Sequence, residues 1–177
     1  LGPVETPLEI TSEEDLEEPA RKLKIARERY TEDHAINDQP IDRATFVIDD
    51  EAHRWHYVRC LDDHFVDLSL FRHTWTYLRA WAYTELNLFD AVEATFTLTT
   101  NGPADIWING EHVHRQEHFH HQEPQSVTFV AALQADDNEI LVRFEEVAAR
   151  ECPYVMALEV AGFEDPEDVT VRVPSAT

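Results

Sequence analysis

The sequence is poor in glycine and in cysteine, and each shortage excludes a class of site. The 177 residues include four glycines, too few and too scattered for the glycine-rich loop that holds a phosphate group. The two cysteines, Cys60 and Cys152, are too few for a disulfide framework and lack the CxxC spacing of a structural zinc site. We expect either two separate, mostly buried thiols or a single bridge between them.

Basic residues and long apolar runs are also scarce. The 14 Lys and Arg residues face 36 Asp and Glu residues, which gives a formal net charge of −22. Such a charge repels phosphate backbones and anionic lipid headgroups, so we expect neither nucleic acid nor a membrane as a partner. No apolar run approaches the roughly 18 to 20 residues that cross a bilayer, and no signal peptide is recognisable. The chain begins at Leu1 rather than Met, which we interpret as the loss or omission of preceding residues, so the compartment stays open.

Residues 1–40 are expected to form a lead-in and one helix. Leu1–Leu8 contains two prolines and a glycine and is predicted to be extended. A helix is predicted from about Ser12 to Tyr30, because acidic residues cluster in its first turns and basic residues in its last. Pro19 interrupts this pattern, so the alternative is a start near Glu17 with Pro19 in the first turn. In either case one helix face carries Leu23, Ala26 and Tyr30.

Residues 41–177 show the pattern of short β-strands. In Val92–Thr100 apolar and polar residues alternate, as in a strand with one buried face. Asn109-Gly110 is the signature of a type I′ hairpin, whose two central residues need positive φ. Turn residues separate the predicted strands, which favours an antiparallel β-sandwich with one N-terminal helix outside it. The predicted strands are Ala44–Ile48, Trp55–Cys60, Phe65–Phe71, Thr74–Leu88, Val92–Thr100, Ala104–Ile108, a returning strand through His112 and Val113, Ser126–Leu133, Glu139–Val147, Tyr154–Val160 and Val169–Val173.

The residues around this hairpin resemble a known family. The stretch from Ala104 to Val113, followed by Leu133 and then by Asn138-Glu139-Ile140-Leu141-Val142, is similar to the second half of a galactose-binding-like jelly roll. The resemblance covers about residues 75 to 162, and it departs at Asp136, where the family usually has glycine. Asn138 is expected to hydrogen-bond the backbone of the turn that it ends. The resemblance implies a module of the kind found beside the catalytic domains of glycoside hydrolases.

The tryptophans are the candidate carbohydrate-binding residues. An exposed aromatic face suits the C–H face of a sugar ring, although large aromatics in a sandwich also belong to the core. Trp107 has the opposite strand parity from its isoleucine neighbours, so it is expected on the outer face of its sheet, as an exposed contact residue. The candidates are Trp55, Trp75, Trp81 and Trp107, from an aromatic set that also includes Tyr77 and Tyr83.

Histidines that follow the hairpin are the candidate metal ligands. On an extended strand His112 and His114 would share a face, as would His118 and His120, so that each pair could chelate one ion. This is the basis of an alternative function, a cupin-like metal-dependent enzyme. The opposing interpretation is a polar loop whose imidazoles face water or acidic neighbours. A structural calcium ion is a further alternative, with the candidate ligands Asp62, Asp63, Asp67, Asp136 and Asp137.

A catalytic constellation is not recognisable in the sequence. The many carboxylates show no spacing that separates an acid from a nucleophile, and there is no Gly-x-Ser-x-Gly elbow. The sequence therefore predicts a non-catalytic accessory module of a larger protein, a glycoside hydrolase, that binds carbohydrate or packs on a catalytic domain, with no cofactor. Besides the cupin-like enzyme, a domain that only mediates assembly, with its helix docked on a partner, stays open.

Overall fold

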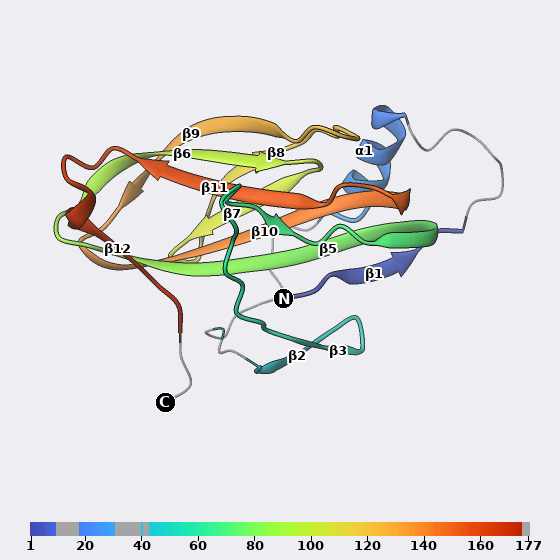
Figure 1. Cartoon of the computed structure of the whole chain (residues 1–177), viewed down its shortest axis with the longest axis horizontal. Helices are drawn as coiled ribbons and strands as arrows, with labels where there is room; N and C mark the ends of the chain where they lie inside the picture. Colours follow the sequence, from blue (N-terminus) through green and yellow to red (C-terminus); the bar gives the residue numbers. More distant parts are fainter. Residues whose placement is uncertain (10–17, 31–39, 41–42, 175–177) are drawn as a thin grey trace.

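Two antiparallel sheets lie face to face, with a small hairpin outside them and a helix at one end (Figure 1). The computed structural model describes residues 1–9, 18–30, 40 and 43–174. Its elements are β1 (Val4–Pro7), α1 (Pro19–Glu28), β2 (Thr45–Ile48), β3 (Glu51–Arg54), β4 (Val66–Asp67), β5 (Phe71–Leu88), β6 (Val92–Thr100), β7 (Ala104–Ile108), β8 (Glu111–Gln116), β9 (Gln125–Leu133), β10 (Asp136–Glu151), β11 (Val155–Ala161), the 3₁₀ turn η1 (Pro166–Asp168) and β12 (Val169–Arg172).

The sheet order confirms the predicted antiparallel β-sandwich. The large sheet runs β1-β5-β10-β7-β8, with β12 also paired to β5, and the smaller sheet runs β4-β11-β6-β9. The alternating segment forms β6 with the predicted bounds Val92–Thr100, and β7 likewise spans Ala104–Ile108. Asn109 and Gly110 between β7 and β8 have φ values of 51° and 81°, as the type I′ turn requires. In the described part of the chain, no helix has the length and apolar character needed to cross a membrane.

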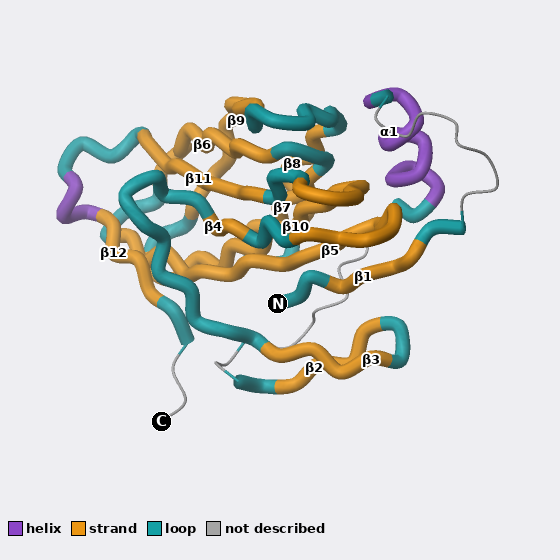
Figure 2. The backbone as a smooth tube through the Cα atoms, turned by 45° about the vertical axis from the view of Figure 1, so that its right-hand side comes forward, coloured by secondary structure: helices purple, strands orange, loops and turns teal. Residues whose placement is uncertain are grey.

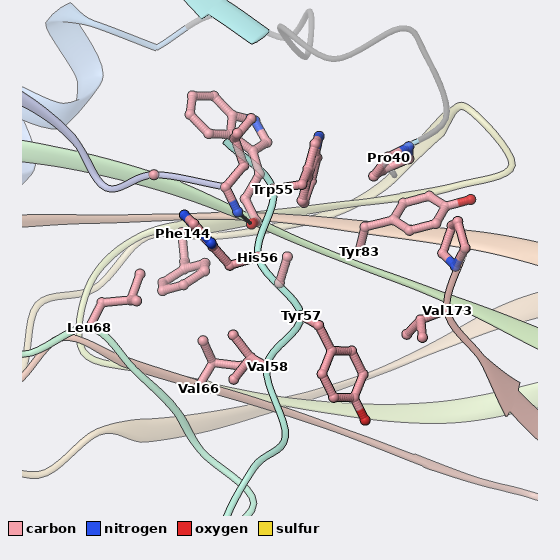
Figure 3. Close-up of a pocket in the computed structure, with 15 residues that line it drawn as sticks. Pro40, Trp55, His56, Tyr57, Val58, Val66, Leu68, Tyr83, Phe144 and Val173 are labelled. Atoms are coloured by element: carbon pink, nitrogen blue, oxygen red, sulfur yellow. Dashed lines mark hydrogen bonds between the residues drawn. The ribbon is translucent and has the colours of Figure 1, made fainter. Parts of the chain in front are cut away.

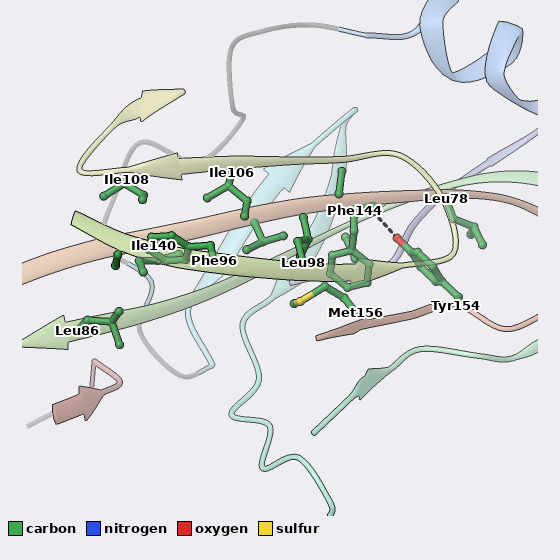
Figure 4. Packing of buried hydrophobic residues seen from close by; sticks show 14 of the residues in the cluster. Leu78, Leu86, Phe96, Leu98, Ile106, Ile108, Ile140, Phe144, Tyr154 and Met156 are labelled. Carbon is green, nitrogen blue, oxygen red and sulfur yellow. Dashed lines mark hydrogen bonds between the residues drawn. The ribbon is translucent and has the colours of Figure 1, made fainter. Parts of the chain in front are cut away.

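The core lies between the inner faces of the two sheets (Figure 4). Strand alternation directs Ile140 and Phe144 of β10 toward Phe96 and Leu98 of β6, and all four side chains are buried. The hydroxyl group of Tyr154 donates a hydrogen bond to the backbone oxygen of Phe144 at 2.6 Å, so its polar end is satisfied inside the core. Burial of these apolar side chains is the main source of stability of a sandwich of this size.

The β2–β3 hairpin forms a third layer on the outer face of the large sheet (Figure 2). Its residue Ile48 packs with Val4 of β1 against Trp81, Trp107 and Leu141. Trp107 does lie on the face opposite its isoleucine neighbours, as strand parity predicts, but only 3% of its surface is exposed. The expectation of an exposed Trp107 is therefore wrong, because strand parity says which face a residue occupies and not what covers that face.

The N-terminal elements dock on the sandwich. The extended lead-in contributes β1, which pairs with residues 76–79 of β5. The helix α1 starts at Pro19, which agrees with the alternative of a start near Glu17, whereas residues 10–17 lie outside the described residues. Leu23 and Ala26, which were predicted to share one helix face, both lie in a cluster with Val147 of β10.

Two of the predicted strands differ in the structure: one does not form and the other is shorter. The predicted strand Trp55–Cys60 is wrong, because the second strand of the hairpin ends at Arg54 and the described residues provide no partner strand for the segment that follows. The predicted strand Phe65–Phe71 shrinks to β4. There the carboxylate of Asp67 accepts a hydrogen bond from the backbone N–H of Ser69 at 2.9 Å, a local turn that ends the strand.

Candidate binding groove at the edge of the large sheet

A groove opens at the edge of β5, where two partner strands leave a gap. Strand β1 pairs with residues 76–79 of β5 and β12 pairs with residues 85–88 of the same edge. The backbone of Leu1 extends the first pairing by hydrogen bonds to the N–H and C=O groups of Trp81. Ala82 and Tyr83 therefore lie between the two partner strands, and the groove forms beside them.

The walls of the groove come from several separate parts of the chain. The segment that follows the hairpin contributes Trp55, His56, Tyr57 and Val58, and β5 contributes Tyr83 with Trp81 and Ala82. Further walls come from the N-terminus, the β4 region and the segment after β12, which includes Val173 (Figure 3). The cavity volume is about 220 Å³. Figure 3 shows the labelled aromatic side chains arranged around it.

Trp55 joins the hairpin to the groove. Its ring meets Phe46 of β2 edge to face at a centroid distance of 6.1 Å and Tyr83 at 6.4 Å. Such edge-to-face pairs add stability beyond the apolar area that they bury. The indole nitrogens of Trp55 and Trp81 are buried and have no hydrogen-bond partner among the described residues. Both N–H groups are enclosed, so a ligand reaches them only after the rings move.

The hydroxyl group of Tyr83 lies between two carboxylates at the outer end of the groove. Its oxygen is 3.0 Å from an oxygen of Glu85 and 3.1 Å from an oxygen of Glu139. Burial and the hydrogen bond to Glu85 raise the pKa of Tyr83, and the charges of both carboxylates act in the same direction. The Tyr83 hydroxyl group is therefore neutral at physiological pH and is a hydrogen-bond donor beside the carboxylates of Glu85 and Glu139.

Of the four candidate tryptophans, the structure brings two into the groove. Trp55 and Trp81 line it. Trp75 lies in another cluster, where its ring is 5.8 Å from the ammonium group of Lys22 in α1, and Trp107 is covered by the hairpin. Sequence reasoning did not select Tyr57, which is 63% exposed and lines the groove. The unbroken aromatic run from residue 55 to residue 57 was the available signal.

The predicted chelating pair His112 and His114 is divided by a bulge. In β8, His114 pairs with Ile106 while His112 pairs with Trp107, so Val113 is an extra residue. The Nε2 atom of His112 lies 2.9 Å from a carboxylate oxygen of Asp105, and its ring lies against Trp107 on the outer face. The His114 ring instead stacks on Phe129 of the smaller sheet at 4.1 Å. The expectation that the two imidazoles share a face is wrong.

The second histidine pair lies in the loop after β8. The rings of His118 and His120 have centroids 5.0 Å apart, and burial together with His120 lowers the pKa of His118. Across the described part of the chain, no group of three or more His, Cys, Asp or Glu side chains is arranged to hold a metal ion. This applies equally to the aspartates considered for calcium, of which Asp63 and Asp67 cap local turns.

The two thiols are separate in the structure. Cys152 is buried, and burial raises its pKa to about 11. Cys60 is exposed, against the expectation that both thiols would be mostly buried. The sequence was compatible with two free thiols or with one disulfide bond, and the structure has two free thiols.

Comparison with known proteins gives structural likeness only. No family model and no curated protein matches the chain. Among solved structures, the chain is similar to a family 35 carbohydrate-binding module from an environmental isolate, with 13% identity over 63% of this chain and 79% of that chain at a TM-score of 0.40. It is also similar to the alpha-xylosidase of Xanthomonas citri, with 15% identity over 54% of this chain and 10% of the enzyme at a TM-score of 0.41. A beta-glucosidase from Kluyveromyces marxianus matches with 14% identity over 68% of this chain and 15% of the enzyme at a TM-score of 0.40. This chain thus corresponds in length to a small part of each of these two enzymes.

Proposed function

We propose that this domain is a carbohydrate-binding module without a catalytic site of its own, and that its ligand occupies the groove beside Tyr83. The observation that carries the proposal is the gathering of Trp55, Tyr57, Trp81 and Tyr83 around one cavity. Aromatic faces pack against the C–H face of a sugar ring, and a mostly apolar pocket with a few polar groups is the usual form of a small-molecule site.

The polar groups of the groove suit a hydroxylated ligand. The indole N–H groups of Trp55 and Trp81 lack acceptors, and a buried donor without a partner costs about 1 to 3 kcal/mol. A sugar hydroxyl is both a donor and an acceptor, so it accepts from an indole N–H after a small ring movement. His56 supplies a further polar group in the lining.

The test uses an exposed residue, so that loss of folding does not imitate loss of binding. A glycan array first identifies ligands, and calorimetry then measures the affinity of wild type, Tyr57→Ala and Phe89→Ala. Phe89 is the matched control, because it is an exposed aromatic residue (85%) outside the groove. We expect Tyr57→Ala to weaken binding by about tenfold, the equivalent of one lost stacking contact, and Phe89→Ala to leave it unchanged. Equal affinities for all three proteins would refute the groove as the site.

Contact with a neighbouring domain of the same polypeptide is a second candidate role. Outside the groove lining, Leu61, Leu70 and Phe71 are exposed to solvent, and exposed apolar residues of this size favour a protein contact. We expect the isolated domain to self-associate weakly through these side chains. Light scattering across a concentration series should then show association that the double variant Leu61→Ser, Phe71→Ser removes; no association at any concentration would count against this role.

A further inference from the structure

The charge of the groove differs from that of the chain. The described residues that line it include no Asp, Glu, Lys or Arg side chain, although the chain as a whole carries a net charge of −22. These side chains therefore bring no carboxylate, guanidinium or ammonium group to the groove.

The surroundings of the groove act against anionic ligands. The Tyr83 hydroxyl group at its outer end contacts the carboxylates of Glu85 and Glu139. A carboxylate or phosphate group placed beside Tyr83 would meet these two negative charges without an Arg or Lys in the described lining to compensate them. Burial of an unpaired charge is strongly unfavourable, and repulsion between like charges adds to that cost.

The size of the groove limits how much of a ligand it encloses. Pockets that enclose drug-sized ligands have volumes of about 300 to 1,000 Å³, whereas this cavity has about 220 Å³. Gly2 and Trp81 close it on the side of β1, and Val173 and Pro174 close it on the side of β12. A volume of about 220 Å³ is sufficient for a single sugar ring and is below the range for larger ligands.

From these observations we propose that the groove selects an uncharged sugar and encloses one terminal ring of it, rather than a uronic acid or the interior of a polysaccharide. This inference rests on the proposed carbohydrate-binding function and deepens it. It assigns Val58 as a specificity-determining position. This half-exposed side chain lines the groove, and a cation at this position would favour acidic over neutral sugars.

The experiment compares neutral sugars with their acids of the same ring configuration. Titrations followed by amide NMR would use glucose against glucuronic acid and galactose against galacturonic acid, and then a disaccharide against a tetrasaccharide of the better neutral sugar. We expect the acids to bind at least about tenfold more weakly than their neutral partners, and the two chain lengths to bind with equal affinity. Acids that bind as tightly as neutral sugars, with that binding lost in Tyr57→Ala, would overturn this inference and leave the proposed function standing. Affinity that rises with chain length would also overturn it. If no sugar of either kind binds, the proposed function fails as well.

Two arginine variants provide a second test of the selectivity. It compares the ratio of acid to neutral affinity between variants, whatever the absolute affinity of the wild-type protein. Val58→Arg adds a guanidinium group at the groove, and Val130→Arg adds one on β9 at a valine of similar exposure, 57% against 52%. We expect the ratio of acid to neutral affinity to rise about tenfold in Val58→Arg and to stay unchanged in Val130→Arg. An unchanged ratio in Val58→Arg, or an equal rise in both variants, would overturn the inference.

Discussion

The side-chain amide nitrogen of Asn109 donates a hydrogen bond to the side-chain oxygen of Asn138 at 3.0 Å. This bond joins the β7–β8 hairpin to the start of β10. Asn138 also accepts from the backbone N–H of Gln134 at 2.9 Å and donates to its backbone oxygen at 2.8 Å, as the sequence predicted for this residue. The two motifs that carry the family resemblance are therefore in direct contact.

Asn138→Ala should destabilise the domain by about 2 to 4 kcal/mol, because the substitution leaves buried backbone groups and the Asn109 amide without partners. Urea unfolding measures this loss. Gln134→Ala is the control, since its side chain makes an exposed hydrogen bond to the backbone oxygen of Asp137 and should cost less than about 1 kcal/mol. Equal losses in the two variants would contradict the structural role of Asn138.

Gly102 and Gly110 should respond differently to a methyl group. A Cβ atom on Gly102 would lie 2.1 Å from the backbone oxygen of Glu145, whereas one on Gly110 would meet no atom within 4 Å. Gly102→Ala should therefore cost about 3 kcal/mol or more, because backbone must move. Gly110→Ala should cost about 1 to 2 kcal/mol, from its positive φ alone. Thermal unfolding of the two variants checks this order, and a smaller loss for Gly102→Ala would contradict the close approach of the two backbones.

The stability of the domain should depend on the protonation of Glu146. This carboxyl group is buried beside the Lys22 ammonium group at 3.8 Å, and burial raises its pKa to about 7, despite the opposing effects of Lys22 and Arg72. Because the pKa is higher in the folded state than in the unfolded state, this contribution is fully present below about pH 4.5 and is lost as the pH rises toward 7.

Glu146→Gln removes this titration, so the difference in unfolding free energy between variant and wild type should change in favour of the variant as the pH rises from 4.5 to 7. The expected change is about 2 to 3 kcal/mol, from the size of the pKa shift. Urea unfolding of both proteins across this range provides the measurement. Because the other carboxylates are common to both proteins, their titration cancels in the difference. A difference that is independent of pH would show that folding does not raise the pKa of Glu146.

Zinc should not bind stoichiometrically to the histidines after the hairpin, because the bulge at Val113 sends His112 and His114 to opposite faces. Metal analysis after dialysis of untagged protein against zinc tests this. One tightly held ion per chain that is lost in a His112→Ala, His114→Ala double variant would contradict the described geometry.

The sequence predicted most of the sandwich because its strands obey local rules. The alternation in residues 92–100 and the Asn109-Gly110 turn specify their strands and hairpin without knowledge of any partner. The cover over Trp107 and the bulge at Val113 depend on segments far apart in the chain, so strand parity could not reveal them. The same holds for the groove, which arises from a gap between β1 and β12 and therefore from two pairings to one strand.

The indole resonances of the four tryptophans report where a sugar binds on the domain. Single Trp→Phe variants assign the four Nε1–H signals, and a neutral sugar selected by the glycan array is then titrated into the wild-type protein. We predict that the signals of Trp55 and Trp81, which line the groove, shift with the ligand, while that of Trp75, beside α1, stays in place. A saturable shift of the Trp75 signal with unchanged Trp55 and Trp81 signals would place the ligand elsewhere and refute the groove as the binding site.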